Sequence, residues 1–292
     1  MVIEMVLKLT RRSPHVTSLR EFFRKIENDQ PAERMVHVYR GHPNQTHVLR
    51  PSLFRKKEYR RDEKNILREL ISIQPNEFRD DRTVFEQLVR MQHYSLPTRL
   101  LDITYNPLVA LYFTCSKDGK IDGDFVRLSV PKSSIKYFDS DTVSCVANLS
   151  NLTGRQRDQI RSMSTSDELK DSDVGERLLH FIQAEKPYFL PKIKIEDLKS
   201  IFAVKPKQTN QRILAQQGAF LLFGLKTLLA EQNDFDITVR TFKVPAEAKQ
   251  PILKELDGIN INASTLFPEI ESAAKYIMSK ITPVEEGFEQ AD

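Results

Sequence analysis

The residue types best suited to chemistry lie close together in one stretch, residues 92–107. This stretch contains His93, Tyr94, Arg99, Asp102 and Asn106, which combine an imidazole that titrates near neutrality, a phenol, a guanidinium, a carboxylate and an amide. Loops held between rigid elements concentrate binding groups, because their backbone and side chains can face a ligand. We therefore interpret residues 92–107 as a turn-rich polar connector between two apolar segments, and we expect the chemistry of the protein there.

Arg40 is a second candidate, because its position in the pattern is unusual for a charged residue. Residues 36–40 alternate between apolar and polar and stop at Gly41, which predicts a short strand with Val36, Val38 and Arg40 on one face. A guanidinium that continues an apolar face requires a carboxylate, a phosphate or a cleft to point into. An internal ion pair with Asp102 is the structural alternative to a role in ligand binding.

Two helices are expected to position the connector. The first begins at a capping box formed by Thr83 and Glu86, which places Gln92 and His93 at its C-terminal end. The second begins with Asn106 as N-cap and a proline at its first position, and its residues 108–115 are apolar nearly all round. The N-terminus of such a buried helix attracts anions, so we expect an anion site where the connector enters it.

The rest of the chain alternates between helical and strand patterns. Helices are predicted over residues 17–27, 58–73, 176–184, 246–256 and 266–281, with a break or kink at Pro251. Strands are predicted over residues 125–130, 201–205, 219–223 and 236–244. These patterns predict an α+β fold with a central mixed β-sheet flanked by helices. The main domain covers residues 1–245, with a polar, mobile segment at 148–172, and residues 246–292 form a C-terminal helical appendage.

Composition narrows the class of protein. The chain has 292 residues, 40% hydrophobic and 29% charged, with a net charge of +4, as is ordinary for a soluble globular protein. No apolar run approaches the ~20 residues of a membrane helix, and Glu4 makes the start a poor signal peptide. Cys115 and Cys145 lack metal-ligand spacing. We expect a cytoplasmic protein with no metal and no membrane partner. Nine glycines without a phosphate loop or dinucleotide fingerprint argue against a P-loop hydrolase or a nicotinamide dehydrogenase.

Basic residues gather in the stretch Arg50–Arg68, where eight Lys or Arg residues are partly balanced by Glu58, Asp62, Glu63 and Glu69. A solvated helix face explains such a run, and so does a patch that faces phosphates. The second interpretation defines a different class of function, a non-catalytic module that binds nucleic acid or an acidic partner protein.

Several motifs occur in a characteristic order: Tyr39-Arg40-Gly41, residues 49–53, 92–102, 106–113 and 210–220. This series resembles the FRG domain, a family named after its (Phe/Tyr)-Arg-Gly triplet. The resemblance runs from about residue 17 to residue 223, and residues 266–269 look like a tail found in that family. FRG domains are mostly uncharacterised prokaryotic and phage proteins, which implies a role as a toxin or in phage defence.

The layout is also distantly similar to that of ADP-ribosyltransferases, which implies that NAD, or a related phosphorylated nucleotide, is the substrate and that the fold is ADP-ribosyltransferase-like. In that similarity Arg40 binds a phosphate or ribose of NAD, and Tyr112 or Tyr105 stacks on the nicotinamide. Gln217 stands where that family has a Glu, and because Gln cannot act as a general base, Asp102 would take that role.

The predicted site follows from these inferences. The catalytic candidates are His93, Asp102 and Gln217, and the ligand-binding candidates are Arg40, Tyr94, Arg99, Tyr105, Asn106 and Tyr112. An ion pair between Arg99 and Asp102 that only shapes the connector is the structural alternative. ADP-ribosyl transfer or NAD hydrolysis is the enzymatic hypothesis; the alternatives are the non-catalytic basic module and a regulatory domain that binds a partner protein.

Overall fold

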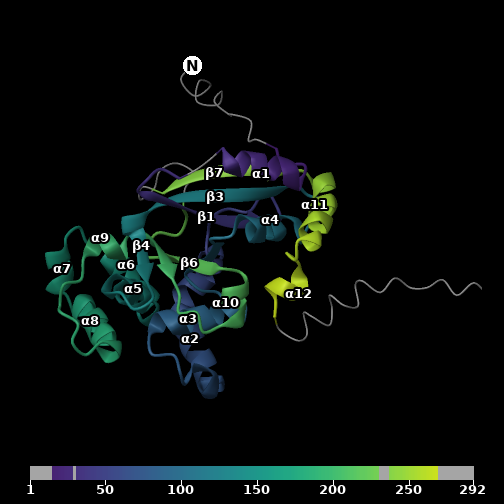
Figure 1. The fold of residues 1–292 in the computed structure, drawn as a ribbon. Coiled ribbons are helices and arrows are strands. Elements are labelled where there is room, and N and C mark those ends of the chain that lie inside the picture. Colours follow the sequence, from purple (N-terminus) through teal and green to yellow (C-terminus); the bar gives the residue numbers. More distant parts are fainter. Residues whose placement is uncertain (1–14, 29–30, 230–236, 269–292) are drawn as a thin grey trace, which may run out of the picture.

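A single mixed β-sheet organises the protein (Figure 1). The structure is a computed structural model that describes residues 15–28, 31–229 and 237–268. Within these residues the strand order is β4-β5-β6-β2-β1-β3-β7. The strands are β1 (Met35–His42), β2 (Leu100–Thr104), β3 (Gly123–Pro131), β4 (Ile135–Tyr137), β5 (Ile201–Lys205), β6 (Gly218–Phe223) and β7 (Thr238–Val244). Only β4 and β5 run parallel. The predicted α+β class with a mixed sheet is confirmed.

The sheet consists of two parts that meet at one residue pair. Strand β2 pairs with β6 along its whole length, and β1 pairs with β3 from Met35 to His42. Between β1 and β2, both fully described, the register contains only the pair Tyr39–Thr104. One part is therefore β4-β5-β6-β2 and the other is β1-β3-β7, and the two strands at the centre separate beyond Tyr39.

Helices cover one face of each part with a separate hydrophobic cluster. Over β1-β3-β7 lie α1 (Leu19–Glu27), α4 (Pro107–Cys115) and α11 (Ala246–Gly258), as Figure 1 shows. Their shared cluster contains Tyr39, Phe125 and Phe242 from the three strands, with edge-to-face ring contacts typical of a packed aromatic core. Helix α12 (Ala263–Leu266) follows α11.

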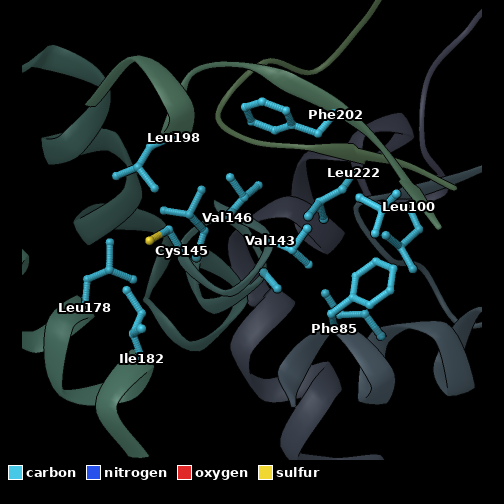
Figure 2. Packing of buried hydrophobic residues seen from close by; sticks show 14 of the residues in the cluster. Phe85, Leu100, Val143, Cys145, Val146, Leu178, Ile182, Leu198, Phe202 and Leu222 are labelled. Carbon is cyan, nitrogen blue, oxygen red and sulfur yellow. The ribbon is translucent and has the colours of Figure 1, made fainter. Parts of the chain in front are cut away.

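The other part of the sheet carries a larger helical layer. Phe85 of α3 (Val84–His93) and Val143 of α5 (Asp141–Ala147) pack toward Leu100 and Leu222 of the sheet, as Figure 2 shows. Behind them lie α2 (Lys57–Ile73), α6 (Gly154–Ser162), α7 (Ser166–Lys170), α8 (Asp173–Glu185) and α9 (Ile195–Leu198). Helix α10 (Gln211–Ala215) instead contacts β6 directly. Short 3-10 turns are η1 (Ser52–Arg55), η2 (Pro75–Phe78), η3 (Lys132–Ser134) and η4 (Asn148–Asn151).

The opposite face of the sheet is covered by connecting segments. Val38, Leu101, Val126 and Leu221 form an apolar row across the strands, and Leu49 packs onto it. Arg40 continues this row as predicted, because it pairs with Val126 and follows Val38 by two residues.

The predicted helices over residues 17–27, 58–73, 176–184 and 246–256 and the four predicted strands are present, with ends displaced by a few residues. Pro251 lies inside an unbroken α11, so the predicted break is wrong, and the alternative of a kink stays a prediction. Ile252 and Leu256 are buried in the cluster under α11, and this packing holds the helix across the missing hydrogen bond. The helix predicted at 266–281 lies outside the described residues beyond 268. The boundary between a main domain and an appendage at residue 245 stays a prediction.

Residues 148–172 are helical and partly buried, and the mobility predicted for them stays a prediction. They form η4, α6 and α7, and they bury Leu149, Leu152 and Ile160. Much of their Ser/Thr content has a capping function, because Thr153 and Thr165 accept hydrogen bonds from the first turns of α6 and α7.

Candidate functional site

The polar connector contains the central strand of the sheet, which corrects its interpretation as a loop. Residues 100–104 form β2, with Leu101 and Ile103 buried on one face and Leu100 buried on the other. Asp102 shares the face of Leu100, which is the face that α3 covers. A loop was expected because Asp102 and two threonines interrupt the apolar pattern, yet the alternation of a buried strand is present.

Arg40 occupies the point where β1 and β2 separate. The backbone of Arg99 bonds to Phe223 of β6, and that of Tyr105 bonds to Gln217, just before β6. By the alternation of antiparallel strands, the backbone of Asp102 therefore faces β1. The Nη1 of Arg40 donates to the carbonyl oxygen of Asp102 at 2.5 Å. The guanidinium therefore fills the place that strand-to-strand hydrogen bonds fill elsewhere in the sheet.

The carboxylate of Asp102 lies beside this guanidinium and is held in place from α3. Its Oδ2 is 3.8 Å from Nη1 of Arg40 and accepts a 2.7 Å hydrogen bond from Nε2 of Gln92. The Oγ1 of Thr98 donates to the Oε1 of Gln92 at 2.5 Å, which fixes the orientation of that amide. The side chain of Asp102 is 56% exposed and that of Arg40 18% exposed, so a ligand can reach the carboxylate.

Two histidines complete the surroundings of Arg40, and neither was selected from the sequence as a site residue. The Nε of Arg40 donates to the Nε2 of His42 at 3.1 Å, so this nitrogen carries no proton. Burial, with the neighbouring charge of Arg40, lowers the pKa of His42 to about 3. His47 lies edge-on to His42, with ring centroids 6.0 Å apart. The charge of Arg55 also contributes to the lowered pKa of both rings.

We call Arg40, His42, Gln92, Thr98 and Asp102 the Arg40 site. Burial lowers the pKa of Arg40, while the carboxylate of Asp102 acts in the opposite direction. The guanidinium contacts Asp102 through Nη1 and His42 through Nε, while Gln92 and Thr98 support the carboxylate of Asp102. The alternation of residues 36–40 identified Arg40 as a candidate, and the motif of residues 92–102 identified Asp102. His42 follows Arg40 by two residues and so lies on the same face of the strand. This spacing could have identified His42 as a candidate as well.

Arg99 lies elsewhere, in a buried charge cluster. Its Nε and Nη2 each donate to a carboxylate oxygen of Glu63 at 2.7 Å, and its Nη1 donates to the carbonyl oxygens of Phe223 and Gly224. Arg157 lies 3.3 Å from the same carboxylate. The alternative of a local pair between Arg99 and Asp102 is wrong, because the carboxylate partner of Arg99 is Glu63 of α2, far away in the sequence. The ligand-binding role predicted for Arg99 stays a prediction.

His93 and Tyr94 end α3 but make different contacts from those of Gln92. The ring of His93 lies perpendicular to that of Phe220, at 6.5 Å between centroids. Tyr94 is exposed and its hydroxyl donates to Glu77 at 3.0 Å, a hydrogen bond that raises the pKa of Tyr94. The catalytic role predicted for His93 and the binding role predicted for Tyr94 stay predictions.

The remaining candidates lie around the far end of β2 and on α4. Asn106 caps α4 by accepting the N–H of Leu108 at 2.9 Å, as predicted for its structural role. Gln217 is exposed, has a φ of 45°, and accepts the N–H of Tyr105 through its carbonyl. Tyr112 packs into the cluster beneath α1 and α11. The predicted roles of Gln217, Tyr105 and Tyr112 toward a ligand stay predictions.

The three residues of the triplet Tyr39-Arg40-Gly41 have different structural roles. Tyr39 packs in the aromatic cluster and Arg40 points to Asp102. Gly41 faces α4 so closely that a Cβ there would lie 2.2 Å from the carbonyl oxygen of Ala110. A side chain at this position would push α4 away from β1.

Two further properties concern the described residues as a whole. They contain no group of three or more His, Cys, Asp or Glu side chains arranged to hold a metal ion. Within the same ranges, no helix combines the length and apolar character that crossing a bilayer requires.

The fold and the Arg40 site together define an α+β protein with a split mixed sheet and a guanidinium–carboxylate pair at the split. Residues 36–123 match the family model described as FRG domain, so this chain is an FRG domain-containing protein. The matched segment includes every residue of the Arg40 site. Searches among curated proteins and among solved structures found no match.

Proposed function

We propose that the Arg40 site binds a phosphorylated nucleotide, with NAD as the first candidate, and that the protein transfers ADP-ribose from NAD or hydrolyses NAD. The observation that carries this proposal is the pairing of the Arg40 guanidinium with an exposed, oriented carboxylate in the gap between β1 and β2. Such a pair offers one group for phosphates and one for the ribose carbon at which the bond breaks.

The cationic part of the site has capacity for an anion. Arg40 uses Nε and Nη1 for His42 and Asp102, and within the described part of the chain its Nη2 donates no hydrogen bond. Arg55 is exposed and near enough for its charge to act on Arg40. Arginine N–H groups are good hydrogen-bond donors to phosphate oxygens. His42 is neutral because its pKa is low, so it contributes no positive charge or acidic proton of its own to the site.

The carboxylate of Asp102 suits the chemistry of an N-glycosidic bond. When the bond between the ribose C1′ and nicotinamide breaks, nicotinamide leaves with the bonding electrons and positive charge develops on the ribose. A nearby carboxylate stabilises this charge, and it accepts the proton of the water or hydroxyl that then attacks C1′. Gln92 holds the carboxylate in one orientation, which reduces the reorganisation needed for this step.

The resemblance to prokaryotic and phage proteins suggests the setting for this activity. Depletion of NAD or modification of a target protein suits a toxin or a phage-defence effector.

The direct test follows nicotinamide release and thermal stability with purified full-length protein and NAD. We expect nicotinamide release and an NAD-dependent rise in Tm for the wild type. Asp102→Asn should lose release while it retains the thermal shift, and Arg40→Ala should lose both. Arg34→Ala, an exposed arginine just before β1, is the matched control and should behave as the wild type.

Two results would separate the parts of this proposal. A thermal shift with ATP or ADP-ribose but not with NAD would retain the nucleotide site and reject NAD as its ligand. No shift with any of the three nucleotides, together with no nicotinamide release, would reject the proposed function.

A further inference from the structure

A strongly cationic pocket lies away from the Arg40 site, between α2 and α6. Its volume is about 490 Å³, and of its twelve lining residues seven are Lys or Arg and one is Asp. Lys57, Arg60 and Arg61 come from α2, and Arg155 and Arg161 come from α6. A cavity with this composition raises the local concentration of anions.

The basic residues of α2 form a continuous stripe. Lys57, Arg61, Lys64 and Arg68 follow one another at spacings of four, three and four residues, which places them on one face of the helix. At 1.5 Å per residue the stripe is roughly 16 Å long. The basic stretch predicted from the sequence is therefore resolved into an ordered row that begins at the pocket.

The acidic residues that balance this stretch in the sequence do not lie in the row. Glu58, Asp62 and Glu69 follow the same spacing one residue later, so they form a parallel stripe about 100° further round the helix. Glu63 points inward to Arg99 and Arg157. Asp62 still lies 3.8 Å from Nη2 of Arg61, so helix geometry separates most of the opposite charges of this stretch but leaves one contact between the two stripes.

Neighbouring helices add to the positive surface. Gly154 at the start of α6 lies so close to α2 that a Cβ there would be 3.4 Å from the Cα of Arg61, which brings Arg155 beside the stripe. Arg177 of α8 acts on Lys64, whose pKa is lowered by desolvation and by the charges of Arg68 and Arg177. Three helices therefore contribute cations to one surface.

The floor of the pocket is also positive. Arg99 and Arg157 are both buried against the one carboxylate of Glu63, so these three side chains carry a net charge of +1, which the nearby carboxylate of Asp158 balances only in part. Above it, Lys57 and Arg155 are exposed, and neither has an acidic partner among the residues that the structure describes. A phosphate bound at this pocket would compensate the buried charge.

We propose that the pocket and the stripe together bind the phosphodiester backbone of a nucleic acid. A free phosphate would occupy the pocket alone, whereas a row of roughly 16 Å has room for several successive phosphates. Contacts of this kind are sequence-independent and depend strongly on salt. The residues are separate from the Arg40 site, so this proposal does not depend on the proposed nucleotide chemistry.

Fluorescence anisotropy with a labelled single-stranded and a duplex oligonucleotide, over a series of salt concentrations, tests the proposal. The test variant is Lys57→Gln/Arg61→Gln/Arg155→Gln, in which all three side chains are exposed. The control is Arg20→Gln/Arg24→Gln/Lys254→Gln, which removes the same charge from α1 and α11 and is likewise exposed. We expect the slope of log K against log salt to fall by about 2 to 3 in the test variant, at about 0.7 to 0.9 per phosphate contact. The control should keep the wild-type slope.

Four results would overturn the proposal. One is no binding of either oligonucleotide at low salt by the wild type. A second is an equal loss of affinity in the test and control variants. The third is displacement of the oligonucleotide by polyglutamate as effectively as by unlabelled nucleic acid, which would indicate an acidic partner protein. Inorganic phosphate that raises the Tm, without any oligonucleotide binding, would likewise reduce the pocket to a small-anion site. Arg40→Ala should bind the oligonucleotide as the wild type does, which keeps this test independent of the NAD assay.

Discussion

Arg40 and Arg99 both belong to the segment that matches the FRG domain, but their surroundings differ. Arg99 is 1% exposed, and each of its three guanidinium nitrogens donates to Glu63 or to a backbone carbonyl. Arg40 is 18% exposed and leaves one nitrogen without a hydrogen bond among the described residues, beside a carboxylate that solvent reaches. Both side chains bridge segments far apart in the sequence, yet only Arg40 has donors left for a ligand.

This contrast shows how a charge that holds the fold can be distinguished from a charge available for binding. A buried guanidinium whose donors are used contributes to the fold, and removing its partner leaves a charge in a medium that solvates it poorly. The Arg40 guanidinium also loses hydration, which lowers its pKa, but it lies beside an exposed carboxylate and retains one nitrogen that donates no hydrogen bond among the described residues. Substitutions in the Arg99–Glu63 cluster should therefore lower stability, whereas substitutions of Arg40 or Asp102 should lower activity with little effect on stability.

Glu63→Ala should produce the largest loss of stability, about 3–5 kcal/mol, because it leaves Arg99 and Arg157 buried without a counter-charge. Urea unfolding measures this loss. Asp62→Ala, at the neighbouring position of the same helix, where the side chain is 47% exposed, should change the free energy of unfolding by less than about 0.5 kcal/mol. Similar losses in the two variants would contradict the distinction between the two kinds of charge.

His42 should make stability depend on pH. Its pKa is about 3 in the folded protein and about 6.5 when unfolded. Between these values the unfolded chain binds more protons, so stability is greatest above pH about 6.5 and falls by up to about 1.4 kcal/mol for each pH unit toward pH about 3. His42→Gln should remove this part of the slope in unfolding experiments between pH 7 and 4. His180→Gln, on the exposed side of α8, is the control and should leave the pH dependence of stability unchanged. If His42→Gln also leaves it unchanged, the burial of His42 does not make stability depend on pH.

Gly41→Ala tests the close approach of α4 to β1. A Cβ 2.2 Å from a backbone oxygen forces the helix to move, at a cost of about 1–3 kcal/mol. Gly119→Ala is the control, because a Cβ there has no atom within 4 Å. The difference in Tm between the two variants measures the effect, and equal Tm values would show that α4 adapts without cost.

Asp102→Asn should have the smallest effect on stability, less than about 1 kcal/mol, because its ion pair with Arg40 is long and exposed. The backbone carbonyl that Arg40 contacts is unchanged by this substitution. Urea unfolding of this variant beside Glu63→Ala compares the two charge sites directly. A loss as large as that of Glu63→Ala would make the Arg40 pair a structural one.

Local signals predicted much of the fold. The capping box at Thr83 and Glu86 and the N-cap at Asn106 are both present, because capping depends on residues within one helical turn. Strand β2 was missed, since only five residues carry its alternation and Asp102 stands in the middle of them. Packing against β1 and β6, which the local pattern does not contain, decides its structure.

The residues of the Arg40 site that could be predicted are those whose position follows from spacing along the chain. Alternation placed Arg40 on the apolar face, and the polar motif contained Asp102 and Gln92. The partner of Arg99 could not be identified in the same way, because Glu63 is 36 positions away and pairs only once α2 has packed onto the sheet. The low pKa of His42 is likewise a consequence of burial and of a neighbouring charge, which a single sequence does not reveal.

The pairing of β2 with β6 has a consequence for synthesis on the ribosome. Leu101 pairs with Leu221, so about 120 residues must be made before β2 finds this neighbour, which takes roughly 6 to 24 s at ordinary elongation rates. During that time Leu100, Leu101 and Ile103 lack the strand that covers one edge of β2, and the separation of β1 and β2 beyond Tyr39 leaves the other edge little protected. The nascent chain should therefore be most prone to aggregation, and most dependent on chaperones, while residues 105–217 are being translated.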